Sequence, residues 1–282
     1  MFKRKWHIEA DNTIQLKEEN NKSERIPEII TSYYSAAGNR EYQQDMVYVS
    51  PGSKLAYNSK TRIIAVVCDG MGGMTDGGLA SRTAVDTLVQ GFEKIKDSED
   101  VDIPLFFTRG IKFIDKKINS IPKVNGKGSG TTMVAVITEG EYLYWASVGD
   151  SRIYIFHNNQ IIWKTTDHNY DLHLQKLVQS GQMTEEEYKS KKQKEALISF
   201  LGIGNVSLMD ISKQPYKMNC GDIVILCSDG VTKTLDDNQI CAIIADDKKS
   251  IKEKAGILVE AAIRGNPFTQ DNTSVAILQY IE

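Results

Sequence analysis

The sequence predicts an α+β fold, a four-layer α/β/β/α sandwich in which two mainly antiparallel sheets are flanked by helix pairs. Short runs rich in Val, Ile and Tyr recur along the chain and are bounded by Gly, Asp or Asn, which is typical of strands. Neighbouring runs are joined by turns, which favours antiparallel sheets over parallel βαβ units. Helical patterns fall between these runs in pairs, so helices are expected on the outer faces of two packed sheets.

Length and composition are those of an ordinary globular protein. The chain has 282 residues, of which 41% are hydrophobic and 25% charged, and its net charge is −3. This balance argues against a nucleic-acid-binding protein, and the longest apolar runs fall far short of the roughly 20 residues of a membrane span. The four cysteines form no CxxC pair, so no zinc site is indicated and a reducing, cytoplasmic location is expected.

The first 30 residues differ from the rest. Residues 1–30 are interpreted as a polar N-terminal extension, because the run from Lys17 to Arg25 contains almost nothing to bury. No long-period repeat and no low-complexity linker divides the remainder. We therefore expect about residues 31–282 to form one compact domain.

Several short apolar runs are expected to be strands, since each is bounded by turn residues. Gly140 and the pair Asn158-Asn159 lie between neighbouring runs and predict hairpin turns. The runs are Asp45–Ser50, Arg62–Cys68, Thr132–Thr138, Tyr142–Val148, Arg152–Phe156, Ile161–Lys164, Asp222–Cys227 and Ser274–Tyr280.

The expected helices form two pairs. In Leu79–Lys96 and Pro104–Ile121, apolar residues recur at intervals of three and four. Asn238–Ala245 and Ser250–Arg264 form the second pair, and Glu253 stands at capping-box spacing from the serine that opens the last helix.

The stretch Asp167–Phe200 stands outside this strand pattern. It is charged, helical and interrupted by glycine. Thr184 and Glu187 predict a capped short helix within it. We expect an insertion that lies over another part of the molecule and has a mobile tip.

Aspartates recur at the ends of the predicted strands. Asp69 and Asp229 each follow an apolar strand and precede a glycine, while Asp150 follows a third strand and Asp271 precedes a fourth. A carboxylate at the edge of an apolar core is costly unless it is paired, hydrogen-bonded or bound to a metal. A single Asp-Gly pair indicates only a turn. Four aspartates in matched contexts favour a site for a hard divalent ion, Mg²⁺ or Mn²⁺.

Nucleotide-binding motifs are weak. Gly126-Lys127-Gly128-Ser129 departs from the P-loop pattern, because a glycine follows the lysine. No GxGxxG motif follows a strand in the context of a dinucleotide-binding fold. The glycine-rich run after Asp69 instead lets the backbone approach a ligand closely just before a predicted helix.

Seven short motifs share one order along the chain. Together they resemble the bacterial metal-dependent protein phosphatases, the type 2C serine/threonine phosphatases, over about residues 31–282, and the β-sandwich with helix pairs of that family agrees with the fold predicted above. The motifs are Arg40-Glu41-Tyr42-Gln43-Gln44-Asp45, Ala65-Val66-Val67-Cys68-Asp69-Gly70-Met71-Gly72-Gly73, Ser129-Gly130-Thr131-Thr132, Val148-Gly149-Asp150-Ser151-Arg152, Thr165-Thr166-Asp167-His168, Leu226-Cys227-Ser228-Asp229-Gly230 and Asp271-Asn272-Thr273-Ser274.

The resemblance implies a two-metal phosphatase site. Asp69 would bridge two Mn²⁺ or Mg²⁺ ions, with the Gly70 carbonyl on one of them, and Asp229 and Asp271 would complete the other. Asp45 belongs to the same metal set by this resemblance. A water activated by both ions would attack phosphorus directly, without a phospho-enzyme.

The same resemblance implies roles around the metals. Arg40 would grip the substrate phosphate through its planar guanidinium. Gln44 and Asn272 would support the metal-bound waters and the neighbouring carboxylates. Asp150, together with Asp229, would hold a third ion. The insertion Asp167–Phe200 resembles the flap of this family and would lie beside the active site.

Three positions depart from the family pattern. Gln44 replaces a frequent glutamate. Met71 stands where animal members carry a histidine proposed as general acid, so the proton donor is unassigned, and His168 is expected to make a structural hydrogen bond near Asp167 instead. Lys233 replaces an aspartate that helps to hold the third ion, so this ion is expected to bind weakly if it binds at all.

The expected function is hydrolysis of phosphoserine and phosphothreonine in proteins that a cognate serine/threonine kinase phosphorylates. We expect a monomer with no membrane span and no nucleic-acid partner. Two alternatives stay open at this point: a non-catalytic phosphoprotein-binding regulator on the same fold, and a phosphatase for small metabolites. The presence of Asp69 and Asp229 favours an enzyme over the regulator.

Overall fold

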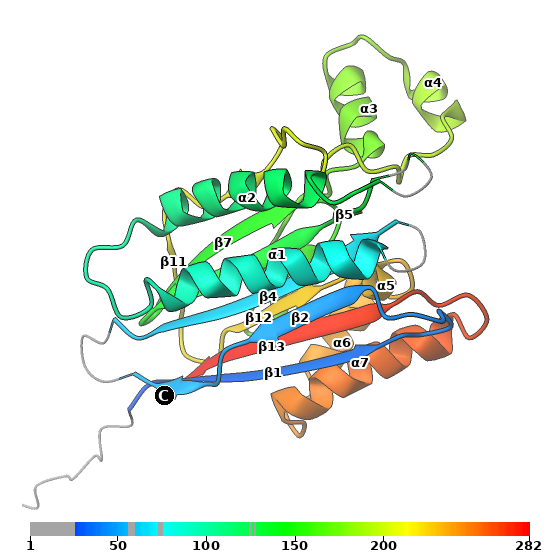
Figure 1. Ribbon diagram of the computed structural model, residues 1–282. Helices are drawn as coiled ribbons and strands as arrows, with labels where there is room; N and C mark the ends of the chain where they lie inside the picture. The colour runs from blue at the N-terminus through cyan, green and yellow to red at the C-terminus, as the bar shows by residue number, and fades with distance from the viewer. Residues whose placement is uncertain (1–25, 56–59, 73–75, 124–125, 127) are drawn as a thin grey trace, which may run out of the picture.

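The computed structural model describes residues 26–55, 60–72, 76–123, 126 and 128–282 (Figure 1). Residues 1–25 of the expected N-terminal extension lie outside the described residues. So do residues 73–75 of the glycine-rich run and parts of the segment 124–127. No helix in the described part of the chain is both long and apolar enough to cross a bilayer.

Two antiparallel sheets form the middle of the molecule. The first sheet contains, in spatial order, β3 (Ser53–Lys54), β1 (Glu28–Ala36), β13 (Thr273–Ile281), β12 (Ile223–Cys227), β8 (Arg152–His157) and β9 (Gln160–Lys164). The second sheet contains β10 (Asp210–Ile211), β7 (Tyr142–Val148), β6 (Met133–Glu139), β4 (Arg62–Met71) and β2 (Asp45–Val49), with β11 (Tyr216–Lys217) on β7 and β5 (Gly130–Thr131) on β4.

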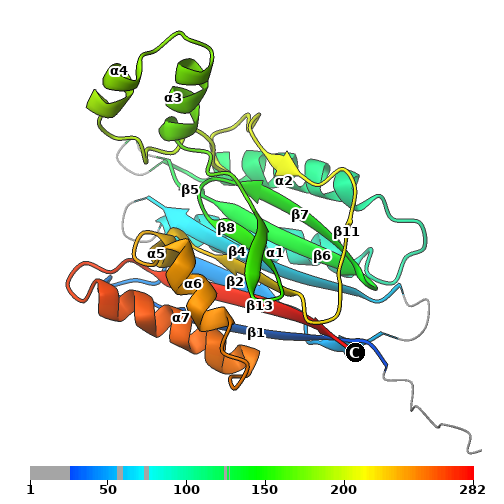
Figure 2. The same ribbon diagram turned by 180° about the vertical axis from the view of Figure 1, so that it is seen from behind.

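Helix pairs cover the outer faces of both sheets, as Figures 1 and 2 show from opposite sides. The helices α1 (Asp76–Glu93) and α2 (Ile103–Asn119) lie on the second sheet. The helices α6 (Asp237–Ile244) and α7 (Ile251–Gly265) lie on the first sheet, and the short α5 (Asp229–Thr232) follows β12. The predicted four-layer α/β/β/α sandwich is therefore confirmed.

Alternation along β4 shows how the layers are built. Ile64 and Val66 are buried beneath α1 and α2, whereas Ile63 and Val67 are buried between the two sheets. Because both faces of the strand are covered, its sequence is an unbroken apolar run rather than an alternating one. Each such side chain contributes roughly 1.5–3 kcal/mol by leaving water.

Local signals in the sequence placed most elements correctly. Gly140, with φ 57°, and the pair Asn158 and Asn159, with φ 48° and 61°, form the predicted hairpin turns. Ser250 and Glu253 form the predicted capping box of α7. The strand β1 was not among the predicted runs, although it pairs with β13 over nine residues.

The segment 167–200 projects beyond the sandwich (Figure 1). It contains α3 (Tyr170–Gln179) and α4 (Glu185–Ser190), and Thr184 and Glu187 form the predicted capping box. Leu174 is the buried residue of α3, and α4 buries none. Most of the segment therefore makes little contact with the core.

Candidate active site

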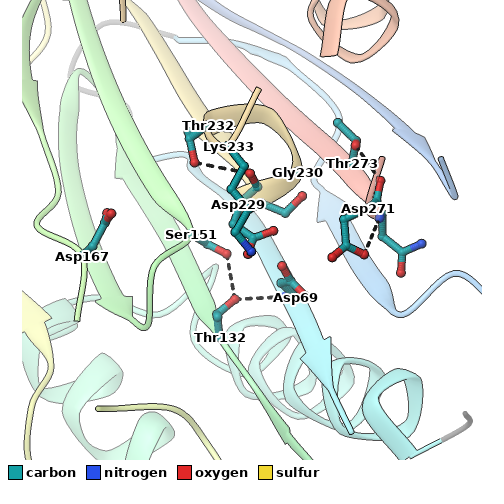
Figure 3. Close-up of polar contacts among 12 residues, drawn as sticks. Asp69, Thr132, Ser151, Asp167, Asp229, Gly230, Thr232, Lys233, Asp271 and Thr273 are labelled. Carbon is teal, nitrogen blue, oxygen red and sulfur yellow. Dashed lines mark hydrogen bonds and ion pairs between the residues drawn. The ribbon is translucent and has the colours of Figure 1, made fainter. Parts of the chain in front are cut away.

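Four aspartates from separate elements line one pocket of about 250 Å³. Asp69 lies near the end of β4, Asp150 follows β7, Asp229 begins α5 and Asp271 precedes β13. In Figure 3 the carboxylates of Asp69, Asp229 and Asp271 point toward one another, whereas Asp167 lies apart from them. The recurrence of aspartates at strand ends thus produces one cluster in space.

Hydrogen bonds hold the backbone of Asp69 on both sides. Its amide donates to the Thr132 hydroxyl at 3.0 Å, and its carbonyl accepts from the Thr132 amide at 2.9 Å and from the Thr131 hydroxyl at 2.8 Å. The Thr132 hydroxyl also bonds to the Ser151 hydroxyl at 2.7 Å (Figure 3). Because these bonds use main-chain groups of Asp69, its carboxylate stays directed into the pocket.

Only glycine fits at position 70. A Cβ atom there would lie 2.1 Å from the carbonyl oxygen of Gly77 in the first turn of α1. The Gly70 amide donates to the Gln44 carbonyl at 3.2 Å. This close approach joins β4, α1 and the start of β2 at the floor of the pocket, which Gly70 and Met71 both line.

Asp45 lies behind the pocket wall rather than in it. Its side chain is 5% exposed, its Oδ2 accepts from the Ser228 hydroxyl at 2.7 Å, and its Oδ1 has no partner among the described residues. Burial raises the pKa of Asp45 from 3.8 to about 7, and the charges of Asp229 and Asp271 add to this effect. Hydrogen bonds from Ser228 and Ser274 oppose it.

The pKa values of Asp69 and Asp150 are raised as well. Burial raises the pKa of Asp69 well above its usual range, and the charge of Asp45 adds to it. The pKa of Asp150 rises to about 7, first through burial and then through Asp229, while Lys233 acts in the opposite direction. Buried like charges repel unless a proton or a cation neutralises them, so this cluster favours a bound cation.

Two basic side chains already contact the cluster. Lys233 forms an ion pair with Asp229 Oδ2 from one turn further along, so it pairs with Asp229 rather than with Asp150 or solvent. Arg40 Nη2 lies 2.8 Å from Asp271 Oδ2, and the Arg40 side chain is 59% exposed. Arg40 is therefore both at the pocket and accessible from outside.

Asn272 ties the loop of Arg40 to the start of β13. Its Oδ1 accepts from the Gln44 amide at 2.7 Å, and its Nδ2 donates to the carbonyls of Ala37 and Tyr42 at 2.9 and 3.0 Å. These three hydrogen bonds hold the backbone of residues 37–44 against the start of β13. Asn272 and Gln44 both line the pocket, and their support of metal-bound waters stays a prediction.

The donor set fits a hard divalent ion. Its groups are carboxylates and a carbonyl, and the Oδ1 atoms of Asp45 and Asp229 are buried without a partner among the described residues. No three Asp, Glu, His or Cys side chains in that part of the chain are grouped tightly enough to hold an ion as they stand. Instead, Lys233 forms an ion pair with Asp229, and Arg40 forms one with Asp271.

His168 has a structural role, as predicted. The Gly149 amide donates to its Nδ1 at 3.2 Å, and its Nε2 lies 3.2 Å from Asp210 Oδ2. Nearby, Asp167 accepts two hydrogen bonds from Arg152 at 2.8 and 2.7 Å, which anchors the start of the 167–200 segment to β8.

Two supporting residues had no role in the sequence analysis. The Ser228 hydroxyl bonds to Asp45 and accepts from the Ser274 amide at 3.0 Å, so it joins β2, β12 and β13. Gln270 Nε2 donates to the Gly230 carbonyl at 2.6 Å. Each stands beside an aspartate that lines the pocket, Asp229 or Asp271, and that adjacency is the signal that identifies them.

Comparisons with known proteins agree on one family. The family model for Protein phosphatase 2C matches residues 35–255. The chain is 28% identical over 228 residues to the serine/threonine phosphatase stp of Listeria welshimeri, covering 79% of this chain and 86% of that protein. The serine/threonine phosphatase of S. agalactiae has a similar structure, with a TM-score of 0.75, 28% identity and coverage of 90% of this chain and 100% of that chain.

A further structural neighbour shows the same fold at lower identity. It is the catalytic domain of the serine/threonine protein phosphatase PstP, solved in complex with two manganese ions. The TM-score is 0.68 at 24% identity, and the match covers 91% of this chain and 100% of that chain.

Proposed function

Because this chain belongs to the protein phosphatase 2C family and is a serine/threonine protein phosphatase, we propose that its catalytic metals bind at the aspartate cluster. In this proposal Asp69, Gly70, Asp229 and Asp271 would hold two Mn²⁺ or Mg²⁺ ions. The observation that carries it is the convergence of carboxylates on one pocket, with buried carboxylate oxygens that have no hydrogen-bond partner within the described part of the chain. An enzymatic role also removes the alternative of a non-catalytic regulator.

The bound ions supply positive charge that lowers the pKa of a water molecule and stabilises the phosphoryl group during in-line displacement. The chain's own residues prepare this reaction. Arg40 is exposed at the pocket rim and binds the substrate phosphate, leaving Asp271 free for its ligand role. Asp45, held by Ser228, supports the cluster from behind, and Asp150 with Asp229 offers a weak third position.

The substrates are phosphorylated proteins that a cognate serine/threonine kinase modifies, and we expect the enzyme to act as a cytoplasmic monomer. The wide exposure of Arg40 supports a protein substrate, because a phosphorylated side chain on a large surface reaches a shallow rim more readily than a deep cavity.

The test measures phosphate release from a phosphothreonine peptide with Mn²⁺, with Mg²⁺ and after chelation. We expect activity with metal, none after chelation, and a loss of at least a thousandfold in kcat for Asp69→Asn, since the substitution removes a carboxylate that would hold the ions. Asp247→Asn, a change at an exposed aspartate that does not line the pocket, is the matched control. Near-normal turnover by Asp69→Asn would contradict the two-metal assignment.

A further inference from the structure

A second hollow of about 260 Å³, as large as the active-site pocket, lies where the C-terminal end of α2 meets the return of the 167–200 segment. Figure 1 shows α2 ending beside β5 at the base of that segment. Its walls combine large apolar side chains with polar groups and glycines, and one of the polar groups is an ammonium. The residues that matter here are Ile118, Ile121, Lys123, Ser129, Phe200 and Ile203.

Two stretches of chain, residues 129–132 and 197–200, run from the second hollow to the active-site pocket and form walls of both. On one wall, Thr132 lines the active site and Ser129 lines the second hollow. On the other wall, Leu197 lines the active site and Phe200 lines the hollow. Each stretch thus crosses from pocket to pocket in three residues, which span at most about 10 Å when the chain is fully extended. A bound peptide in extended form covers the same distance in about three residues.

The hollow is preformed, because hydrogen bonds hold its edges. Thr131 and Leu201 exchange backbone hydrogen bonds of 3.0 and 2.8 Å, which joins the two walls. The buried carboxylate of Asp115 accepts from the amides of Gly202, Gly204 and Val206 at 2.8, 3.0 and 3.1 Å. The wall of the hollow is therefore already ordered before a ligand binds. Binding then costs little free energy for ordering the protein.

Two features indicate that the hollow accepts a ligand. Ile203 is 48% exposed at its edge, although the neighbouring Ile118 is 1% exposed. The Ser129 hydroxyl is buried and has no hydrogen-bond partner among the described residues. An apolar side chain would cover Ile203, and a peptide backbone beside it would offer a partner to the hydroxyl.

We propose that this hollow is a substrate subsite, which binds an apolar side chain about three residues away from the phosphorylated serine or threonine of the protein substrate. The proposal rests on the proposed function, since it takes the aspartate pocket as the place of the phosphate. Lys123 at the rim disfavours a basic neighbour of that apolar residue. The subsite selects among phosphoproteins without touching the reacting phosphate.

The test uses phosphothreonine peptides with a serine-rich background and a single leucine, moved from two to five residues away on either side. For the wild-type enzyme we expect kcat/KM to rise about tenfold when leucine lies three or four residues away on one side, with a lower KM as the main cause. A flat response to the leucine position would overturn the subsite.

Ile203→Asp removes this preference and leaves hydrolysis of p-nitrophenyl phosphate unchanged, because that small substrate does not reach the hollow. Ile162→Asp is the matched control, since Ile162 has the same 48% exposure but lies on β9. Ile203→Ser, a milder change at the same exposed position, has to reduce the preference as well. If both Ile203 variants keep the full leucine preference, the subsite is wrong, whereas failure of the proposed function shows as lost p-nitrophenyl phosphate turnover in the wild type.

Discussion

Lys233 introduces a positive charge where the predicted metal ligands are negative. Its ammonium pairs with Asp229 Oδ2 and lies in the field of Asp150 and Asp69. Burial alone would lower the pKa of Lys233, but the charge of Asp229 and the hydrogen bond to it raise the net pKa above the ordinary value. Lys233 therefore stays charged and competes with a metal ion for Asp229.

Replacing Lys233 by methionine should strengthen Mn²⁺ binding. A half-exposed ion pair is worth at most about 1 kcal/mol, so the dissociation constant should fall roughly fivefold. Isothermal titration calorimetry of the metal-free proteins measures this directly. Lys249→Met removes another pair at the same spacing, with Glu253, away from the site and should change nothing. Equal affinity in wild type and Lys233→Met would show that the lysine does not compete.

The contact between α2 and the loop after the 167–200 segment depends on one buried carboxylate. Asp115 is 2% exposed and accepts three backbone hydrogen bonds from residues 202–206. That loop continues from Leu201, which pairs with Thr131 beside Asp69. The helix thus fixes both the root of the segment and the strand β5, which bonds to Asp69.

Asp115→Ala should destabilise the protein by about 3 kcal/mol or more, because three buried amides lose their acceptor. The loss should appear first as faster amide hydrogen exchange in residues 197–206, while exchange in β12 changes less. Asp86→Ala on the exposed face of α1 is the control. Uniform acceleration across all strands, or none in 197–206, would argue against a local anchor.

The charge cluster makes the stability of the whole molecule depend on pH and metal together. Asp45 and Asp150 titrate at about 7 in the folded protein, against 3.8 ordinarily. At a pH between 3.8 and about 7, these two carboxyl groups are deprotonated in the unfolded chain but still protonated in the folded protein. Rising pH from about 4 to about 7 therefore favours the unfolded metal-free protein, by up to roughly 1.4 kcal/mol per pH unit for each group.

With chelator present, the melting temperature should fall as pH increases from 5.5 to 7.5. Mn²⁺ should raise it by about 5–10 °C at one hundred times the dissociation constant, and this gain should be larger at pH 7.5 than at pH 5.5. Thermal unfolding followed by circular dichroism measures both. Asp45→Asn should flatten the dependence without metal, since the amide does not titrate. A melting temperature that rises over this range without metal would contradict the assignment.

The sequence alone determined the local elements and the chemical type of the site. Capping boxes, turn residues such as Gly140, and apolar periodicity depend on neighbours within a few positions. They can therefore be predicted without knowledge of the fold. The motifs around Asp69 and Asp229 likewise carried the family resemblance, which the family match then confirmed.

Only the tertiary structure decided how these parts meet. The strand β1 has a mixed pattern and is stabilised by pairing with β13, more than 230 positions away. The burial of Asp45 under Ser228 and the hollow beside Ile203 also join distant segments. Such contacts depend on which chain segments pack together, and that choice comes from the sum of many weak long-range interactions rather than from any local pattern.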